Sequence, residues 1–67
     1  MAIQTWPLSR HGTHGEIIAI QLIDMTTGLV VETIEGGDSR AALKAYARQD
    51  ELNGAPVDPF IAAELAR

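Results

Sequence analysis

The stretch from Glu16 to Gly37, EIIAIQLIDMTTGLVVETIEGG, decides the fold of this chain. Its first part, Glu16 to Ile23, alternates between two faces that are both mostly apolar, which predicts a central strand covered on both sides. The β-branched run from Leu29 to Ile34 predicts a second strand. The loop between them ends at Gly28, which suits a left-handed position, so the two strands are expected to form an antiparallel hairpin.

Upstream of this hairpin, Met1 to Leu8 alternates loosely and predicts a further short strand. Pro7 assigns that strand to an edge of the sheet, because proline cannot donate to a ladder of hydrogen bonds. Ser9 to Gly15 is expected to be a loop.

Downstream of the hairpin, Asp38 and Ser39 are good N-caps for a helix that runs from Arg40 to about Leu52. Gly54 is expected to stop it. The inward stripe of this helix is predicted to be Ala42, Ala45, Tyr46, Gln49 and Leu52, with Leu43 at the margin.

Asp58-Pro59 predicts a second helix that continues to Arg67, with aspartate at the cap and proline at the first helical position. This helix is too short to be stable alone, so its apolar residues must dock on the core or on another chain. They are Phe60, Ile61 and Leu65.

The order of three strands and then two helices predicts an α+β fold: a three-stranded antiparallel sheet with two helices packed on one face. We expect one small domain over residues 1–67, with strands and hairpin in 1–35, a first helix in 38–53 and a short second helix in 58–67.

Composition narrows the class of protein. A chain of 67 residues buries only about 60% of its unfolded surface, so oligomerisation, a partner or tight packing must add stability. The chain has no cysteine, which excludes disulfides and thiolate metal sites. There is no run of about 18–20 apolar residues and no secretion signal at the N-terminus, so a cytoplasmic location is expected.

Charge is segregated along the chain. Residues 16–38 carry five acids and no base, whereas the total is only −4. This acidic hairpin either docks on a basic surface of another protein or serves as a charged edge that prevents aggregation. The bases Arg40, Lys44 and Arg48 lie on one ridge of the first helix, where Glu51 can pair with Arg48. Direct binding of nucleic acid is disfavoured, because that requires clustered bases.

His11 and His14 flank Gly12-Thr13 and could converge on one metal ion, but no third or fourth ligand is evident. The alternative is an exposed loop whose histidines respond to pH. We expect no cofactor. We expect no enzyme either, because a domain of this size rarely encloses a pocket that excludes water.

One stretch has a resemblance. Gly37-Asp38-Ser39, the alanine-rich helix and the exit Gly54-Ala55-Pro56-Val57-Asp58-Pro59 are similar to the hairpin-then-helix stretch of HicB-type antitoxins. The similarity covers about residues 37–59. It departs from those antitoxins at Glu35-Gly36, which stands in place of their proline–glycine loop. The resemblance implies an antitoxin-like protein that associates with itself.

The leading hypothesis is a small non-enzymatic interaction module whose acidic hairpin docks on a basic surface of a larger protein. Its size and acidity resemble those of inhibitors from phages and mobile elements, including inhibitors of CRISPR effectors. The expected partner-binding residues are Glu32, Glu35, Asp38, Trp6 and Phe60. The alternatives are a homo-oligomer that pairs through the Pro7-bearing strand or the second helix, and a metal- or pH-responsive loop protein.

Overall fold

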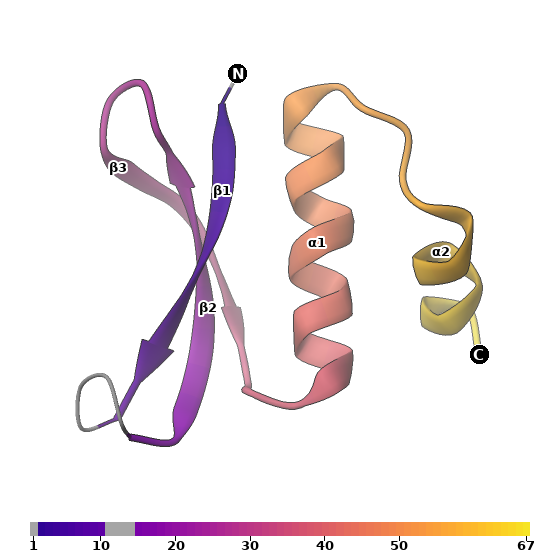
Figure 1. Ribbon diagram of the computed structural model, residues 1–67, viewed down its shortest axis with the longest axis horizontal. Helices are drawn as coiled ribbons and strands as arrows, with labels where there is room; N and C mark the ends of the chain where they lie inside the picture. Colours follow the sequence, from indigo (N-terminus) through magenta and orange to yellow (C-terminus); the bar gives the residue numbers. More distant parts are fainter. Residues whose placement is uncertain (1, 11–14) are drawn as a thin grey trace.

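A computed structural model describes residues 2–10 and 15–67 of the chain. Its elements in chain order are β1 (Ile3–Ser9), β2 (Ile17–Asp24), β3 (Leu29–Glu35), α1 (Ser39–Asn53) and α2 (Pro59–Leu65). The three strands form one antiparallel sheet in the order β1-β2-β3. The predicted βββαα fold is therefore confirmed, and both helices lie on the same side of the sheet (Figure 1).

The core lies between β2 and α1. Ile20 and Leu22 of β2 share this face of the sheet with Ile3 of β1. They pack against Ala41 and Ala45 of α1, whose short side chains let the helix lie close to the sheet. Leu22 is fully buried, which stabilises the fold by about 1.5–3 kcal/mol.

The inward stripe of α1 differs from the predicted one. Ala45 is buried as expected, and Ala42 and Leu52 pack partly buried against the core, but Ala41 is also buried at the centre and Tyr46 is 49% exposed. The prediction was therefore wrong for Tyr46 and omitted Ala41. The sheet instead approaches α1 through its smallest residues, which leaves no room for a tyrosine ring between them.

The second helix packs only on the first. Among the described elements, α2 contacts α1 and no strand, and it lies beyond α1 as seen from the sheet (Figure 1). Ala47 is buried on that far side of α1, about half a turn away from Ala45. The guanidinium of Arg40 donates to the carbonyl oxygens of Glu64 and Leu65, at 3.4 and 3.0 Å, and so caps the last turn of α2.

The ends of α1 follow the predicted chemistry. The carboxylate of Asp38 accepts a 2.8 Å hydrogen bond from the backbone N–H of Ala41, and Gly54 ends the helix with a left-handed φ of 73°. Before the helix, Gly37 passes so close to β2 that a Cβ there would lie 1.9 Å from the carbonyl oxygen of Ile17. Only glycine fits at that crossing.

One expectation about the sheet is wrong. The apolar alternation of β2 predicted cover on both sides, but the helices cover one face only, and no described residue covers the other (Figure 1). The strand is central and lies between two neighbours in the sheet, yet its second face is open.

Candidate functional site

The outer edge of β1 is closed by side chains of α1. Ala2 O accepts from Met25 N, and pairing alternates along the strands, so the backbone groups of Ile3, Thr5 and Pro7 point away from β2. The amide of Asn53 accepts from Ile3 N at 2.8 Å and donates to Ile3 O at 3.1 Å.

One helical turn earlier, the side chain of Gln49 accepts from Thr5 N at 2.9 Å. Pro7 has no N–H to offer. From Ile3 to Pro7 the edge therefore holds no free donor for a further strand. Sequence reasoning recognised Pro7 and placed Gln49 on the inward side of the helix, but it did not predict that Gln49 and Asn53 bind the strand. Their signal is the spacing of Gln49 and Asn53 at i and i+4, which places both on one side of the helix.

The outer edge of β3 is open. Gly36 N donates to Ile18 O, and from that pair the alternation turns the N–H and C=O of Thr33 and Glu35 away from β2. None of these outward backbone groups has a hydrogen-bond partner among the described residues. The side chains of Leu29, Val30 and Val31 at the start of the strand are also 66%, 47% and 47% exposed. A strand edge of this kind is a template for pairing with another chain.

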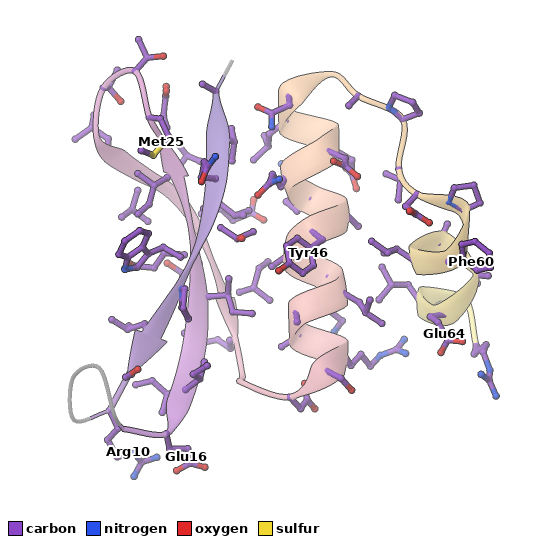
Figure 2. The ribbon with its side chains drawn as sticks, in the orientation of Figure 1. Arg10, Glu16, Met25, Tyr46, Phe60 and Glu64 are labelled. Atoms are coloured by element: carbon purple, nitrogen blue, oxygen red, sulfur yellow. The ribbon has the colours of Figure 1, made fainter. Side chains whose placement is uncertain are left out.

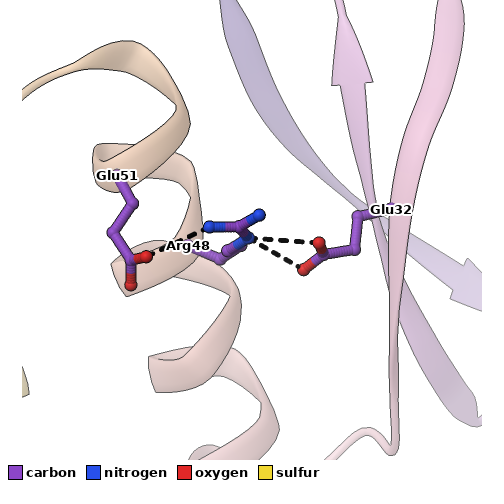
Figure 3. Close-up of polar contacts among 3 residues, drawn as sticks. All are labelled: Glu32, Arg48 and Glu51. Atoms are coloured by element: carbon purple, nitrogen blue, oxygen red, sulfur yellow. Dashed lines mark hydrogen bonds and ion pairs between the residues drawn. The ribbon is translucent and has the colours of Figure 1, made fainter.

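The side chain of Glu32 ties β3 to α1. Its carboxylate accepts from Nε of Arg48 at 3.1 and 3.2 Å, and another guanidinium nitrogen of Arg48 donates to Glu51 at 3.1 Å (Figure 3). The hydrogen bond and the charge of Glu32, with a smaller effect of Glu51, raise the pKa of Arg48 above its ordinary value. All three side chains are at least one-third exposed, so the pair positions the strand more than it stabilises it.

The acids expected to contact a partner differ in their surroundings. Glu32 is engaged with Arg48, and Asp38 caps α1. Glu35 is exposed and has no ion-pair or side-chain hydrogen-bond partner among the described residues. Glu35 is therefore the predicted acid that is most available to another molecule.

The two predicted apolar anchors are both exposed but lie far apart. Trp6 is 60% exposed on the open face of the sheet, on the face opposite to the α1-facing residues. Phe60 is 85% exposed on α2, the element farthest from the sheet (Figure 2). The structure does not bring them together into one surface.

The predicted histidine site lies outside the described residues, since it consists of His11 and His14. In the part of the chain that the structure describes, no group of three histidines, cysteines or acids could hold a metal ion. Nor is any helix there long and apolar enough to cross a membrane.

A shallow apolar groove of about 230 Å³ lies where β1 parts from α1. Pro7 and Ile20 line its sheet side, and Ala42 and Tyr46 line its helix side. On α1 it lies on the N-terminal side of Gln49, where no amide of the described residues links strand and helix. The groove contains no charged side chain, and the polar side chains that line it are those of Thr5 and Tyr46.

Comparisons with known proteins add no assignment: no family model matches the chain, and no curated protein or solved structure is significantly similar to it. The resemblance of residues 37–59 to HicB-type antitoxins therefore stays a prediction.

Proposed function

We propose that this protein is a non-enzymatic interaction module that binds an extended, basic segment of another protein along the edge of β3. The observation that carries the proposal is the difference between the two edges of the sheet. The edge of β1 is closed by Asn53, Gln49 and Pro7, whereas the outward backbone groups of β3 are unpaired among the described residues. A partner strand that joins β3 gains main-chain hydrogen bonds in addition to side-chain contacts.

Charge favours a basic partner. The segment that contains β3, residues 16–38, holds five acids and no base. Glu35 is exposed at the end of the strand, and lysine or arginine at alternate positions of an added strand would lie beside it. The negative electrostatic potential of these acids would also speed the encounter with a basic surface.

The class of protein follows from size and chemistry. A 67-residue domain with an available strand edge and an acidic surface can occupy a basic site of a larger machine that normally takes an anionic ligand. An inhibitor or regulator of a protein that handles nucleic acid, of the kind encoded by phages, is the function this arrangement supports best.

The test uses two variants of one residue. Thr33→Pro removes an outward N–H and blocks strand addition, whereas Thr33→Val keeps it. The probe is a short synthetic peptide of alternating lysine and valine, with a glutamate–valine peptide as its control. We expect calorimetry to detect the lysine peptide with wild type and Thr33→Val, and at least tenfold weaker binding with Thr33→Pro. Equal binding by all three proteins, or no binding by wild type, would contradict the proposal.

A further inference from the structure

The face of the sheet opposite to α1 has an unusual composition for a surface in water. Strand register places nine residues on it in three rows. The rows are Gln4–Ile23–Val30, Trp6–Gln21–Thr33 and Leu8–Ala19–Glu35. Five of the nine are apolar and only Glu35 is charged, although the chain as a whole carries a net charge of −4.

Several of these side chains stand out into solvent. Trp6 is 60% exposed, Val30 47% and Leu8 39%, and no described residue covers them. In a sheet with one face in water, the side chains on that face are mostly polar or charged. The open face of this sheet is mostly apolar instead. An exposed apolar patch of this kind marks a surface that another molecule covers.

We infer that a second copy of this chain covers this face, so that two sheets pack face to face as a symmetric dimer. Two molecules of equal negative charge repel each other, and this face is where they can meet with a single acid from each. The inference does not rest on the proposed function, because the backbone edge of β3 stays open when the faces are covered, but both use the side chain of Glu35.

The positions of the few charges favour one two-fold axis. Glu35 lies at the end of β3, and Arg10 follows β1 at the same end of the sheet, on the opposite edge. An axis parallel to the strands lays β3 of one copy over β1 of the other and brings Glu35 near the second copy's Arg10. Arg10 is available, because its contact with Glu16 is 4.0 Å long and both side chains are exposed (Figure 2).

The monomer also has reason to associate. Seven of the described apolar residues are buried, and four of them are alanines. A face-to-face pair would add a second apolar layer about 10 Å thick, the usual spacing of packed sheets. Three short strands present only about 300 Å² of plan area per copy, which is less than the roughly 800 Å² that each partner buries in a standard interface. We therefore expect a dimer that dissociates on dilution.

Trp6 is the only tryptophan and lies in the middle row of the face, so it reports on the interface directly. The experiment is a dilution series of the full chain, followed by sedimentation and by tryptophan emission. We expect twice the chain mass of 7.2 kDa at high micromolar concentration, and a fall to one chain mass with a red shift of emission in the same range. A single chain mass at the highest concentration, with emission typical of exposed tryptophan, would overturn the inference.

Variants separate this face from other surfaces. Val30→Lys places a charge on the face and is expected to give a monomer at all concentrations, whereas Phe60→Lys on α2 is the matched control and stays dimeric. Far-UV circular dichroism establishes that each is folded, and the exposed Glu35→Arg replaces Val30→Lys if the latter is not. A dimer that survives Val30→Lys, that is not weakened by Glu35→Arg, or that is lost in Phe60→Lys would contradict the assignment to this face.

The axis has its own test. Glu35→Arg and Arg10→Glu are each expected to raise the dissociation constant about tenfold, and the double reversal to restore it. No recovery in the double variant would rule out the parallel axis. If wild type is a monomer that binds the lysine peptide, the dimer is wrong and the proposed function is supported. If wild type is a dimer that does not bind the peptide, the dimer is supported and the proposed function is wrong.

Discussion

The two edge strands of the sheet are both seven residues long, but the hydrogen bonding of their outer edges differs. Strand β1 is bound on its outer side by neutral amides from α1, which occupy its backbone donors, and proline removes a further one. Strand β3 packs on the core through Ile34, its only side-chain hydrogen bonds to α1 among the described residues are those of Glu32, and its outward backbone stays unpaired there. One helix therefore closes one edge of the sheet and leaves the other available, which gives a small domain a single direction in which to add a strand.

Both edges depend on the packing of β2 beneath α1, and the largest effect is expected there. Leu22→Ala removes the one large side chain that is fully buried in the described part of the chain, and a cavity of this kind costs about 2–5 kcal/mol. In a domain of this size that is a large share of the free energy of unfolding. Urea unfolding at one fixed low protein concentration measures it. A loss below 1 kcal/mol, on the other hand, would mean that the core lies elsewhere.

Opening the β1 edge is expected to be the next largest effect. Asn53→Ala removes two hydrogen bonds to Ile3, at 2.8 and 3.1 Å, with an expected loss of about 1–2 kcal/mol in the free energy of unfolding. Asn53→Asp is the matched variant, since a carboxylate still accepts from Ile3 N but cannot donate to Ile3 O, and it should lie between wild type and Asn53→Ala. Equal stability of all three proteins would show that the amide does not hold the strand.

The difference between the edges also shows what the sequence can reveal. Strands, hairpin and helix caps were predictable because local signals such as Pro7, Gly28 and Asp38 act on their immediate neighbours. The amide clamp, meaning the hydrogen bonds of Gln49 and Asn53 to β1, was not predictable. Asn53 and Ile3 are fifty residues apart, and an amide near a helix end is equally typical of a stop signal. The open face was missed for a related reason: apolar alternation in β2 shows that a face is apolar and does not show what covers it.

Within the candidate site, sequence reasoning found the exposed Glu35 and Trp6 but treated Glu32 and Asp38 as equally available. Whether an acid faces solvent or pairs inside the chain depends on which base the fold brings near it. Arg48 comes near Glu32 only because α1 packs across the sheet. That proximity is a property of the tertiary structure, and no local pattern records it.

A proline in the middle of β1 tests the clamp from the side of the strand. Thr5→Pro removes the N–H that donates to Gln49 at 2.9 Å, and we expect a loss of about 1 kcal/mol in the free energy of unfolding. Combining it with Gln49→Ala completes a double-mutant cycle. If the two losses simply added, the strand and the amide would not be coupled, and the clamp would reduce to Asn53 alone.

The ionic attachment of β3 should respond to salt, unlike the amide clamp of β1. Arg48→Gln removes the hydrogen bonds to Glu32 at 3.1 and 3.2 Å, and we expect a shift of the urea midpoint smaller than that of Thr5→Pro. Raising the salt concentration should shrink this difference from wild type, because screening already weakens an exposed pair. The effect of Asn53→Ala should stay constant over the same range. A salt-dependent Asn53→Ala would mean that charge holds both edges.

The smallest effect on folding is expected on the open edge, and it completes the comparison. Thr33→Pro sits at the same kind of outward position as Thr5→Pro, but the N–H that it removes has no partner among the described residues. The free energy of unfolding should therefore fall by less than in Thr5→Pro, because no hydrogen bond is lost and only the backbone effect of proline remains. Both prolines remove an outward N–H of an edge strand, but only the donor of Thr5 is in use, and the side chain of Thr5 is half-buried whereas that of Thr33 is exposed. Similar costs for both, measured on the same urea series, would mean that the β3 edge is as occupied as that of β1, and strand addition there would lose its basis.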